Sequence, residues 1–126
     1  MILEHDGKCY SQTGAILRYL GAVFGYYPAD ALQAWKADSI VDSSVDIYNT
    51  YAKAFFEPNE EKKNTLFDDL INKVYPAWLE AMNNRLIKNG SKEHIVGTSW
   101  TTADFAIAGF LSAHAWNEAN NLHDRV

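Results

Sequence analysis

The chain has 126 residues, 48% of them hydrophobic, and a formal net charge of −5 at pH 7. A chain of this length can bury roughly two-thirds of its unfolded surface, while its negative charge argues against nucleic acid or an anionic membrane as the main partner. The single cysteine, Cys9, excludes an internal disulfide, so we expect the cytoplasm or another reducing intracellular compartment. The longest apolar run near the end, residues 105–111, is far too short for membrane insertion.

The first stretch reads ILEHDGKCYSQTGAILRYLGAVFG over residues 2–25 and predicts two strands, joined by a tight turn, and then a helix. Asp6-Gly7 is the turn, because an Asp-Gly pair supplies the positive φ angles of a two-residue hairpin. Ser11 stands at the predicted N-cap of the helix. Two strands are marginal in water, so we expect the hairpin to need further sheet. Five apolar positions predict a core-facing stripe on the helix: Ile16, Leu17, Leu20, Val23 and Phe24.

Long helices dominate the middle of the chain. Residues 25–30 are a predicted linker, and Asp30 is the expected N-cap of a helix over residues 31–56. Pro58 breaks that helix, and residues 60–74 predict another helical segment.

The next helix is expected to begin after a proline and to end at a glycine. Pro76 interrupts the preceding segment and occupies the first turn of a helix over residues 77–88, where proline is tolerated. Gly90 is the expected residue just past its C-terminus. Residues 93–97 then predict an extended connection.

The last predicted helix opens with a capping box. Thr101 is the N-cap and Asp104 is the third helical residue, so each side chain can bond the other's backbone amide. Trp100 and Phe105 occupy the hydrophobic staple positions around this box. Residues 105–111 are apolar nearly all round, which predicts a helix buried at the centre of the domain.

Two of these motifs carry a family resemblance. ILEHDGK followed by YSQTGAILRYLG resembles the end of the thioredoxin-like domain of cytosolic glutathione S-transferases, especially sigma-type members. Val96-Gly97 followed by TTADF is similar to the V-G…[ST]-x-A-D-F pattern of the same family. The resemblance implies a mainly α fold: residues 1–27 are a hairpin and helix from a thioredoxin-like α/β domain, and residues 28–126 are the helical C-terminal bundle.

Gln12 and Thr13 are the first candidate binding residues. On spacing alone they read as a polar helix start after a hairpin. The resemblance implies instead that they hold the γ-glutamyl end of glutathione, with Thr13 in place of the family's serine. The amides and partial positive charge of a helix N-terminus suit a carboxylate.

Asp38, Asp42 and Asp46 recur every four residues on one face of the second helix. The pattern alone is typical of a solvated acidic face, in which like charges repel weakly. In the resembling enzymes, an aspartate at the position of Asp46 reaches across the dimer to the glutathione amino group bound by the other subunit. We carry that role to Asp46 only, together with the expectation of a homodimer.

Tyr48, Tyr51 and Phe55 follow on the same helix. Ordinary aromatic core explains them from the pattern alone, whereas the resemblance implies a wall of the pocket for the hydrophobic co-substrate. The resemblance gives Thr101 and Asp104 a structural, capping role. No metal-ligand spacing joins Cys9 to the four histidines, and no metal site is predicted. These histidines are His5, His94, His114 and His123.

The resemblance also implies a feature without a counterpart in this sequence. In the family, a Tyr, Ser or Cys near the start of the thioredoxin-like domain activates the glutathione thiol, because the thiolate is the nucleophile. We therefore expect no catalytic residue within this chain. One hypothesis is a partial glutathione S-transferase or glutathione-dependent isomerase, with glutathione as substrate and no cofactor. The other is a non-catalytic subunit or interaction module of a larger assembly that covers the exposed sheet edge.

Overall fold

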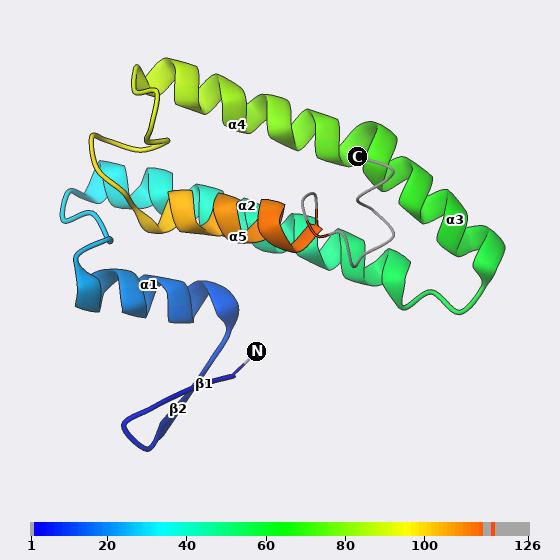
Figure 1. The fold of residues 1–126 in the computed structure, drawn as a ribbon, viewed down its shortest axis with the longest axis horizontal. Coiled ribbons are helices and arrows are strands. Elements are labelled where there is room, and N and C mark those ends of the chain that lie inside the picture. Colours follow the sequence, from blue (N-terminus) through cyan, green and yellow to red (C-terminus); the bar gives the residue numbers. More distant parts are fainter. Residues whose placement is uncertain (1, 115–116, 118–126) are drawn as a thin grey trace.

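The computed structural model describes residues 2–114 and residue 117, and these are mainly helical. A small hairpin leads into a series of packed helices (Figure 1). The expected mainly α architecture with an N-terminal hairpin is confirmed. In chain order, the elements are β1 (Ile2–His5), β2 (Lys8–Ser11), α1 (Thr13–Phe24), α2 (Ala31–Phe55), α3 (Glu60–Asp69), the π-helical turn η1 (Leu70–Val74), α4 (Tyr75–Asn89) and α5 (Thr102–His114).

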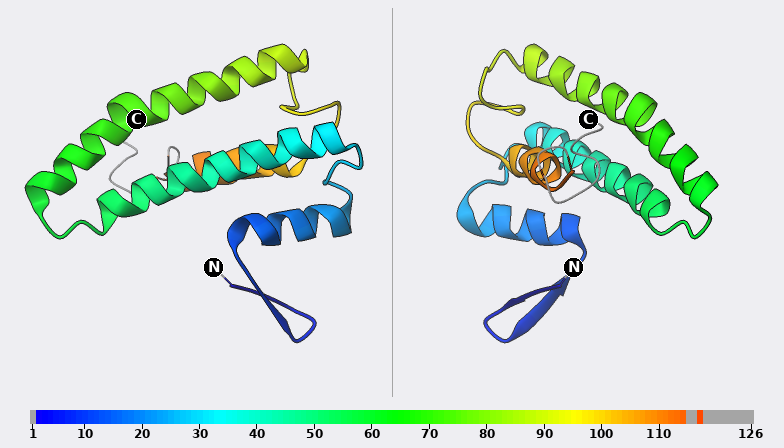
Figure 2. Two further views of the ribbon diagram at one scale, coloured as in Figure 1. Left: turned by 180° about the vertical axis from the view of Figure 1, so that it is seen from behind. Right: turned by 45° about the vertical axis from the view of Figure 1, so that its right-hand side comes forward.

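The hairpin forms as the sequence predicts. β1 and β2 are antiparallel, and Ile2 lies opposite Ser11 at the open end. Asp6 (φ 52°) and Gly7 (φ 70°) both adopt the left-handed conformation that this kind of two-residue turn requires. Figure 2 shows the hairpin projecting beyond α1, away from the other helices.

The start of α1 differs from the prediction. Ser11 is not the N-cap, because it pairs with Ile2 and is therefore part of the strand. The chain turns into the helix one residue later, at Gln12 (φ 70°, ψ 110°), whose side chain makes no capping hydrogen bond. The expected apolar stripe is also incomplete: Ile16 is buried, whereas Phe24 at the end of the helix is 65% exposed.

α2 and α5 lie side by side at the centre of the fold, with α1 on one side and α4 on the other (Figures 1 and 2). Two hydrogen bonds join α4 to α2: Trp78 Nε1 donates to Ser43 Oγ at 3.2 Å, and Arg85 Nη1 donates to Ser39 Oγ at 2.9 Å. Among the described residues, no helix is both long and apolar enough to cross a bilayer. The core cluster consists of Ala37, Ile40, Ile47, Leu70, Tyr75, Trp78, Met82, Ile95, Val96, Ala103 and Phe110.

The predicted caps of the long helices are confirmed. The Asp30 carboxylate accepts a hydrogen bond from the Gln33 amide at 2.9 Å and so caps α2. Gly90 follows α4 with φ 72°, and its amide donates to the carbonyl of Ile87. These caps satisfy backbone groups that the helices cannot pair internally.

Pro76 lies in the first turn of α4, as the sequence predicts, but it does not interrupt the helical conformation. The helical conformation runs from Glu60 to Asn89, and a π-helical turn lies just before the proline. In that turn the amide of Tyr75 donates to the carbonyl of Leu70, five residues back. Pro76 has no backbone N–H to donate, and the wider turn shifts the neighbouring hydrogen bond by one residue. The helical conformation therefore continues through the proline.

α5 is less buried than its composition predicted. Ala103 and Phe110 are buried in the core, but Phe105 is 43% exposed and Gly109 also lies on an exposed face. An apolar composition predicts burial only where neighbouring elements cover every face. In the described part of the chain, α1 and α2 cover only part of this helix.

Candidate functional site

The N-terminus of α1 presents the first two candidate residues together. Gln12 and Thr13 are both exposed, and the carbonyl of Gln12 accepts the amide of Ile16 at 2.9 Å. The amides of Thr13, Gly14 and Ala15 therefore precede the first amide that donates within the helix, and they have no partner within it. The first turn also contains no acidic residue. This end of α1 thus offers amide donors and uncancelled partial positive charge to an anion.

The acidic face of α2 is divided by a cation that the sequence analysis did not single out. Arg18 of α1 donates a hydrogen bond from Nη1 to Asp42 Oδ1 at 3.2 Å, and the same atom lies 3.5 Å from Asp38 Oδ1. The hydroxyl of Tyr27 donates to Asp38 Oδ2 at 2.8 Å. α1, the linker and α2 are thereby joined around two carboxylates. No local pattern could reveal the ion pair, because Arg18 and Asp42 are 24 positions apart.

The network changes two pKa values. Burial lowers the pKa of Arg18, but the hydrogen bond that Arg18 donates to Asp42 and the charges of both aspartates outweigh it, so the pKa is raised overall. The hydrogen bond to Asp38 raises the pKa of Tyr27, because it holds the phenol proton on its oxygen. Arg18 therefore stays charged and Tyr27 stays neutral throughout the neutral pH range.

Asp46 differs from the other two aspartates of its row. It is exposed, and no side-chain partner is recorded for it within the described residues. Only its backbone carbonyl is engaged, by the hydroxyl of Thr50 at 2.9 Å. The structure therefore assigns two carboxylates of the acidic face to an internal network and leaves the third one exposed to solvent.

The three aromatic residues further along α2 have unequal environments. Tyr48 and Phe55 are 54% and 51% exposed, whereas Tyr51 is partly buried against the core. The Tyr51 ring stacks on Phe55 with centroids 5.7 Å apart and packs against Phe67 of α3 and His114 of α5. Burial accordingly raises the pKa of Tyr51. Tyr51 is a core contact, and Tyr48 and Phe55 form the exposed part of this group.

Only half of the predicted capping box forms, because the amide of Asp104 donates to the backbone carbonyl of Thr101 at 3.1 Å and not to its side chain. The Asp104 carboxylate, in turn, makes more contacts than a capping box requires. Asp104 Oδ2 accepts the amide of Thr101 at 2.8 Å and its hydroxyl at 3.0 Å, while Oδ1 accepts the amide of Ile95 at 2.9 Å. The carboxylate therefore ties the preceding loop to the helix. The two staple residues have separate partners, since Trp100 packs on His94 and Phe105 packs on Tyr26.

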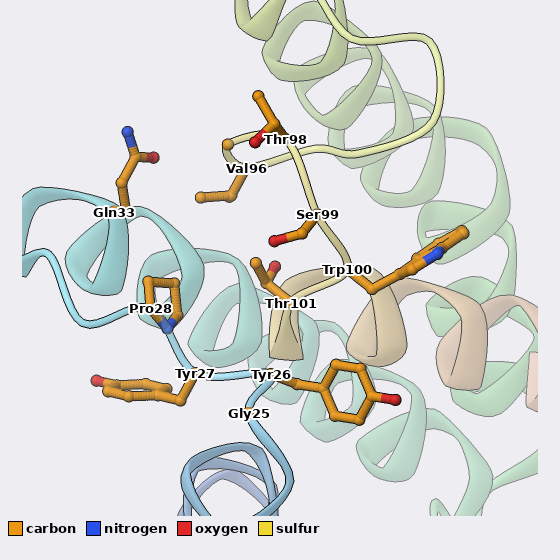
Figure 3. A pocket seen from close by; sticks show the side chains of 11 residues that line it. Gly25, Tyr26, Tyr27, Pro28, Gln33, Val96, Thr98, Ser99, Trp100 and Thr101 are labelled. Carbon is orange, nitrogen blue, oxygen red and sulfur yellow. The ribbon is translucent and has the colours of Figure 1, made fainter.

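A cavity of about 220 Å³ lies away from the candidate binding residues Gln12 and Thr13, although Thr101 lines it. It is lined by residues 25–28, Gln33 and residues 96–101, where the linker meets α2 and the loop before α5 (Figure 3). Gln33 Oε1 is buried there without a hydrogen-bond partner. Because α1 has 12 residues, its two ends are about 18 Å apart, so the cavity is remote from Gln12. No motif of the sequence predicts this cavity.

The candidate metal ligands remain dispersed. No three His, Cys, Asp or Glu side chains come together as a possible metal site in the part of the chain that the structure describes. Cys9 is exposed on β2, and His114 is buried among aromatic rings at the end of α5. His123 lies outside the described residues.

Comparison with known proteins gives matches along most of the chain. A family sequence model described as "Glutathione S-transferase, C-terminal domain" matches residues 45–126. Glutathione S-transferase 2 of Manduca sexta is 32% identical over 110 residues, which are 87% of this chain and 53% of that protein. The hematopoietic prostaglandin D synthase of Gallus gallus is 35% identical over 104 residues, which are 82% of this chain and 50% of that protein. The chain spans about half the length of the curated relatives it matches.

Solved structures give the same picture. Prostaglandin synthase D of Nilaparvata lugens superposes with a TM-score of 0.80 at 27% identity, over 89% of this chain and 55% of that one. Rat hPGDS complexed with a quinoline superposes with a TM-score of 0.71 at 28% identity, over 87% of this chain and 55% of that one. The likeness therefore extends over most of the chain.

Proposed function

The chain belongs to the glutathione S-transferase family, and from this premise we propose that it binds glutathione at the N-terminus of α1. The observation that supports this most strongly is the backbone of Gln12. With its positive φ, Gln12 is the single residue that turns the chain from β2 into α1. This turn places the exposed side chains of Gln12 and Thr13 beside the free amides of the first helical turn. Such a conformation costs about 1–3 kcal/mol at a residue other than glycine, and strain of this kind clusters at functional sites.

The ligand group that fits this end of the helix is the α-carboxylate of the γ-glutamyl residue. The backbone amides of Thr13 and Gly14 donate to it, and the Thr13 hydroxyl adds a third donor. The Gln12 carboxamide can donate to the same carboxylate or accept from the neighbouring ammonium group. Hydrogen bonds to a charged acceptor are roughly twice as strong as neutral ones, so a few donors suffice to fix the γ-glutamyl end.

The ammonium group of glutathione needs an anion, and Asp46 supplies one in this proposal. Its carboxylate is exposed and free of internal side-chain partners within the described residues. We propose a homodimer in which Asp46 of one subunit reaches the glutathione bound by the other. Asp38 and Asp42 do not serve this purpose, because both already pair with Arg18.

Glutathione then serves as the thiolate donor of a transferase, with the electrophile on the exposed aromatic surface of α2. Tyr48 and Phe55 would contact the apolar co-substrate, and Tyr51 would support them from the core. The transfer step needs a residue outside this sequence that activates the thiol, as the family resemblance implies. The thiolate sulfur then forms a bond to an electrophilic carbon while a leaving group departs with its electron pair, or while the electron pair of a double bond moves to the next atom and takes up a proton. We propose a reducing intracellular compartment for this activity, and a boundary between the two structural parts in the linker after residue 27.

The test is retention on immobilised glutathione followed by elution with free glutathione. We expect the wild-type chain to be retained and the Gln12→Ala variant to pass through. Gln33→Ala is the matched control, because it removes the same side chain near the start of another helix and should be retained. If the wild-type chain fails to bind at millimolar ligand, the proposed function is wrong. If Gln12→Ala is retained as well as the wild-type chain, the site is wrong.

A further inference from the structure

The carboxylate of Asp42 lies against the turn of α1 that is proposed to bind glutathione. Gly14 is the second residue of this helix, and a methyl group placed on it would lie 3.7 Å from Asp42 Oδ1. The same methyl group would lie 3.5 Å from Nη2 of Arg18. The first turn of α1, one carboxylate of α2 and the guanidinium of Arg18 therefore meet at one place.

An unpaired carboxylate at this position would oppose the proposed ligand. It would repel the glutathione carboxylate, and it would also attract the partial positive charge that the first turn offers. Asp42 is 64% exposed, so no burial keeps it away from the helix end. The only cation recorded beside it within the described residues is Arg18, one turn further along α1.

Arg18 opposes this effect through its geometry. Its Nη1 donates to Asp42 Oδ1 at 3.2 Å and lies 3.5 Å from Asp38 Oδ1, so one guanidinium is shared by two carboxylates. Asp38 is held from its other oxygen by the Tyr27 hydroxyl at 2.8 Å. Tyr27 of the linker thus fixes Asp38, and Asp38 helps to orient the guanidinium. The guanidinium, which belongs to α1, in turn holds Asp42.

We propose that Arg18 is a positioning residue of the glutathione site, which pairs with Asp42 and so prevents this carboxylate from competing with glutathione for the first turn of α1. The inference rests on the proposed glutathione binding. Its alternative is a simple tether, in which the ion pair only holds α1 against α2. The two roles differ in one respect: a tether needs both partners, whereas a masking cation is needed only while Asp42 carries its charge.

The experiment is a double-mutant cycle read by calorimetric titration with glutathione, using the full chain. Arg18→Gln should weaken binding about three- to tenfold, as one unmasked charge near an anion in a partly exposed site would. Asp42→Asn should bind as tightly as the wild-type chain or more tightly. The double variant should return to within about twofold of the wild-type affinity.

Matched controls separate charge from fold. Lys73→Gln and Asp69→Asn remove the same two charges from an exposed ion pair of α3 and η1, and should leave the affinity unchanged. Arg18→Lys retains the charge and should bind within about threefold of the wild-type chain, which keeps the test valid if Arg18→Gln unfolds.

Three results would overturn the inference. Equal weakening by Arg18→Gln and Asp42→Asn, or a double variant as weak as Arg18→Gln alone, would establish a tether. Loss of binding in Arg18→Lys with retained fold would show that charge is not the relevant property. Absence of binding by the wild-type chain would instead remove the proposed function, and this inference with it.

Discussion

Gly21 of α1 lies so close to Thr102 of α5 that a side-chain carbon on Gly21 would overlap the Thr102 methyl group. The contact is reinforced nearby, because the amide of Thr102 donates to the carbonyl of Tyr26 at 3.0 Å. This crossing fixes the start of α5 against the end of α1. It therefore sets how the hairpin and α1 sit on the helical bundle.

We predict that Gly21→Ala destabilises the fold by about 1–3 kcal/mol, as overpacking of a tight contact does. Urea denaturation followed by circular dichroism measures the change. Gly109→Ala is the matched control in α5, because nothing lies near its added methyl group. There, alanine should gain about 0.5–1 kcal/mol from helix propensity. A Gly21→Ala variant as stable as the wild-type chain would contradict the tight crossing.

The capping aspartate of α5 gives a second prediction. Asp104→Ala removes the acceptor of three hydrogen bonds, two from Thr101 and one from the amide of Ile95. We expect a loss of about 2–3 kcal/mol in the free energy of unfolding, since the amides lose a charged acceptor. Asp30→Ala removes a single capping bond and should cost about 1 kcal/mol. Equal losses for the two variants would show that the loop bond contributes nothing.

His114 should make stability depend on pH. Burial lowers its pKa below the ordinary value of 6.5, so the unfolded chain takes up the proton first. The stability is therefore fully present above about pH 6.5 and falls as the pH is lowered from there. Thermal unfolding between pH 8 and pH 5 measures this fall. His114→Phe should flatten the curve in this range, and an unchanged slope in the variant would assign the effect to other groups.

A substitution at Asp46 should weaken glutathione binding without changing the stability of the fold. Because its side chain makes no recorded contact within the described residues, Asp46→Asn should change the free energy of unfolding by less than about 0.5 kcal/mol. The same variant should weaken glutathione binding about tenfold, since it removes the anion proposed to meet the ammonium group. Glu80→Gln, on the exposed surface of α4, is the charge-matched control. Unchanged glutathione affinity in Asp46→Asn would remove it from the site.

Local chemistry predicted several features of the fold correctly. The turn at Asp6-Gly7 and the cap at Asp30 depend on neighbouring residues alone. The N-cap at Ser11 failed because strand register, which the sequence does not display, places that residue in β2. Pro76 lies in the first turn of α4 as predicted, but the expected interruption before it is absent, because a π-helical turn joins the two segments.

The candidate site was only partly predictable. The helix-start pattern of Gln12 and Thr13 does not by itself indicate binding; the family resemblance supplies that hypothesis, and it stays a prediction. The pairing of Arg18 with Asp42 could not be predicted, since it depends on how α1 packs on α2. The exposure of α5 likewise depends on its neighbours in space, which composition does not specify. Packing between distant elements is the common cause of these differences.

Binding of glutathione to the first turn of α1 can be observed at the amides themselves by NMR. Glutathione would be titrated into the isotope-labelled chain while the backbone amide signals of Thr13, Gly14 and Ala15 are followed. We expect saturable shifts that are largest at these three amides and absent in Gln12→Ala. Shifts that concentrate instead around Ser99, in the remote cavity, or no shifts at millimolar glutathione, would contradict it.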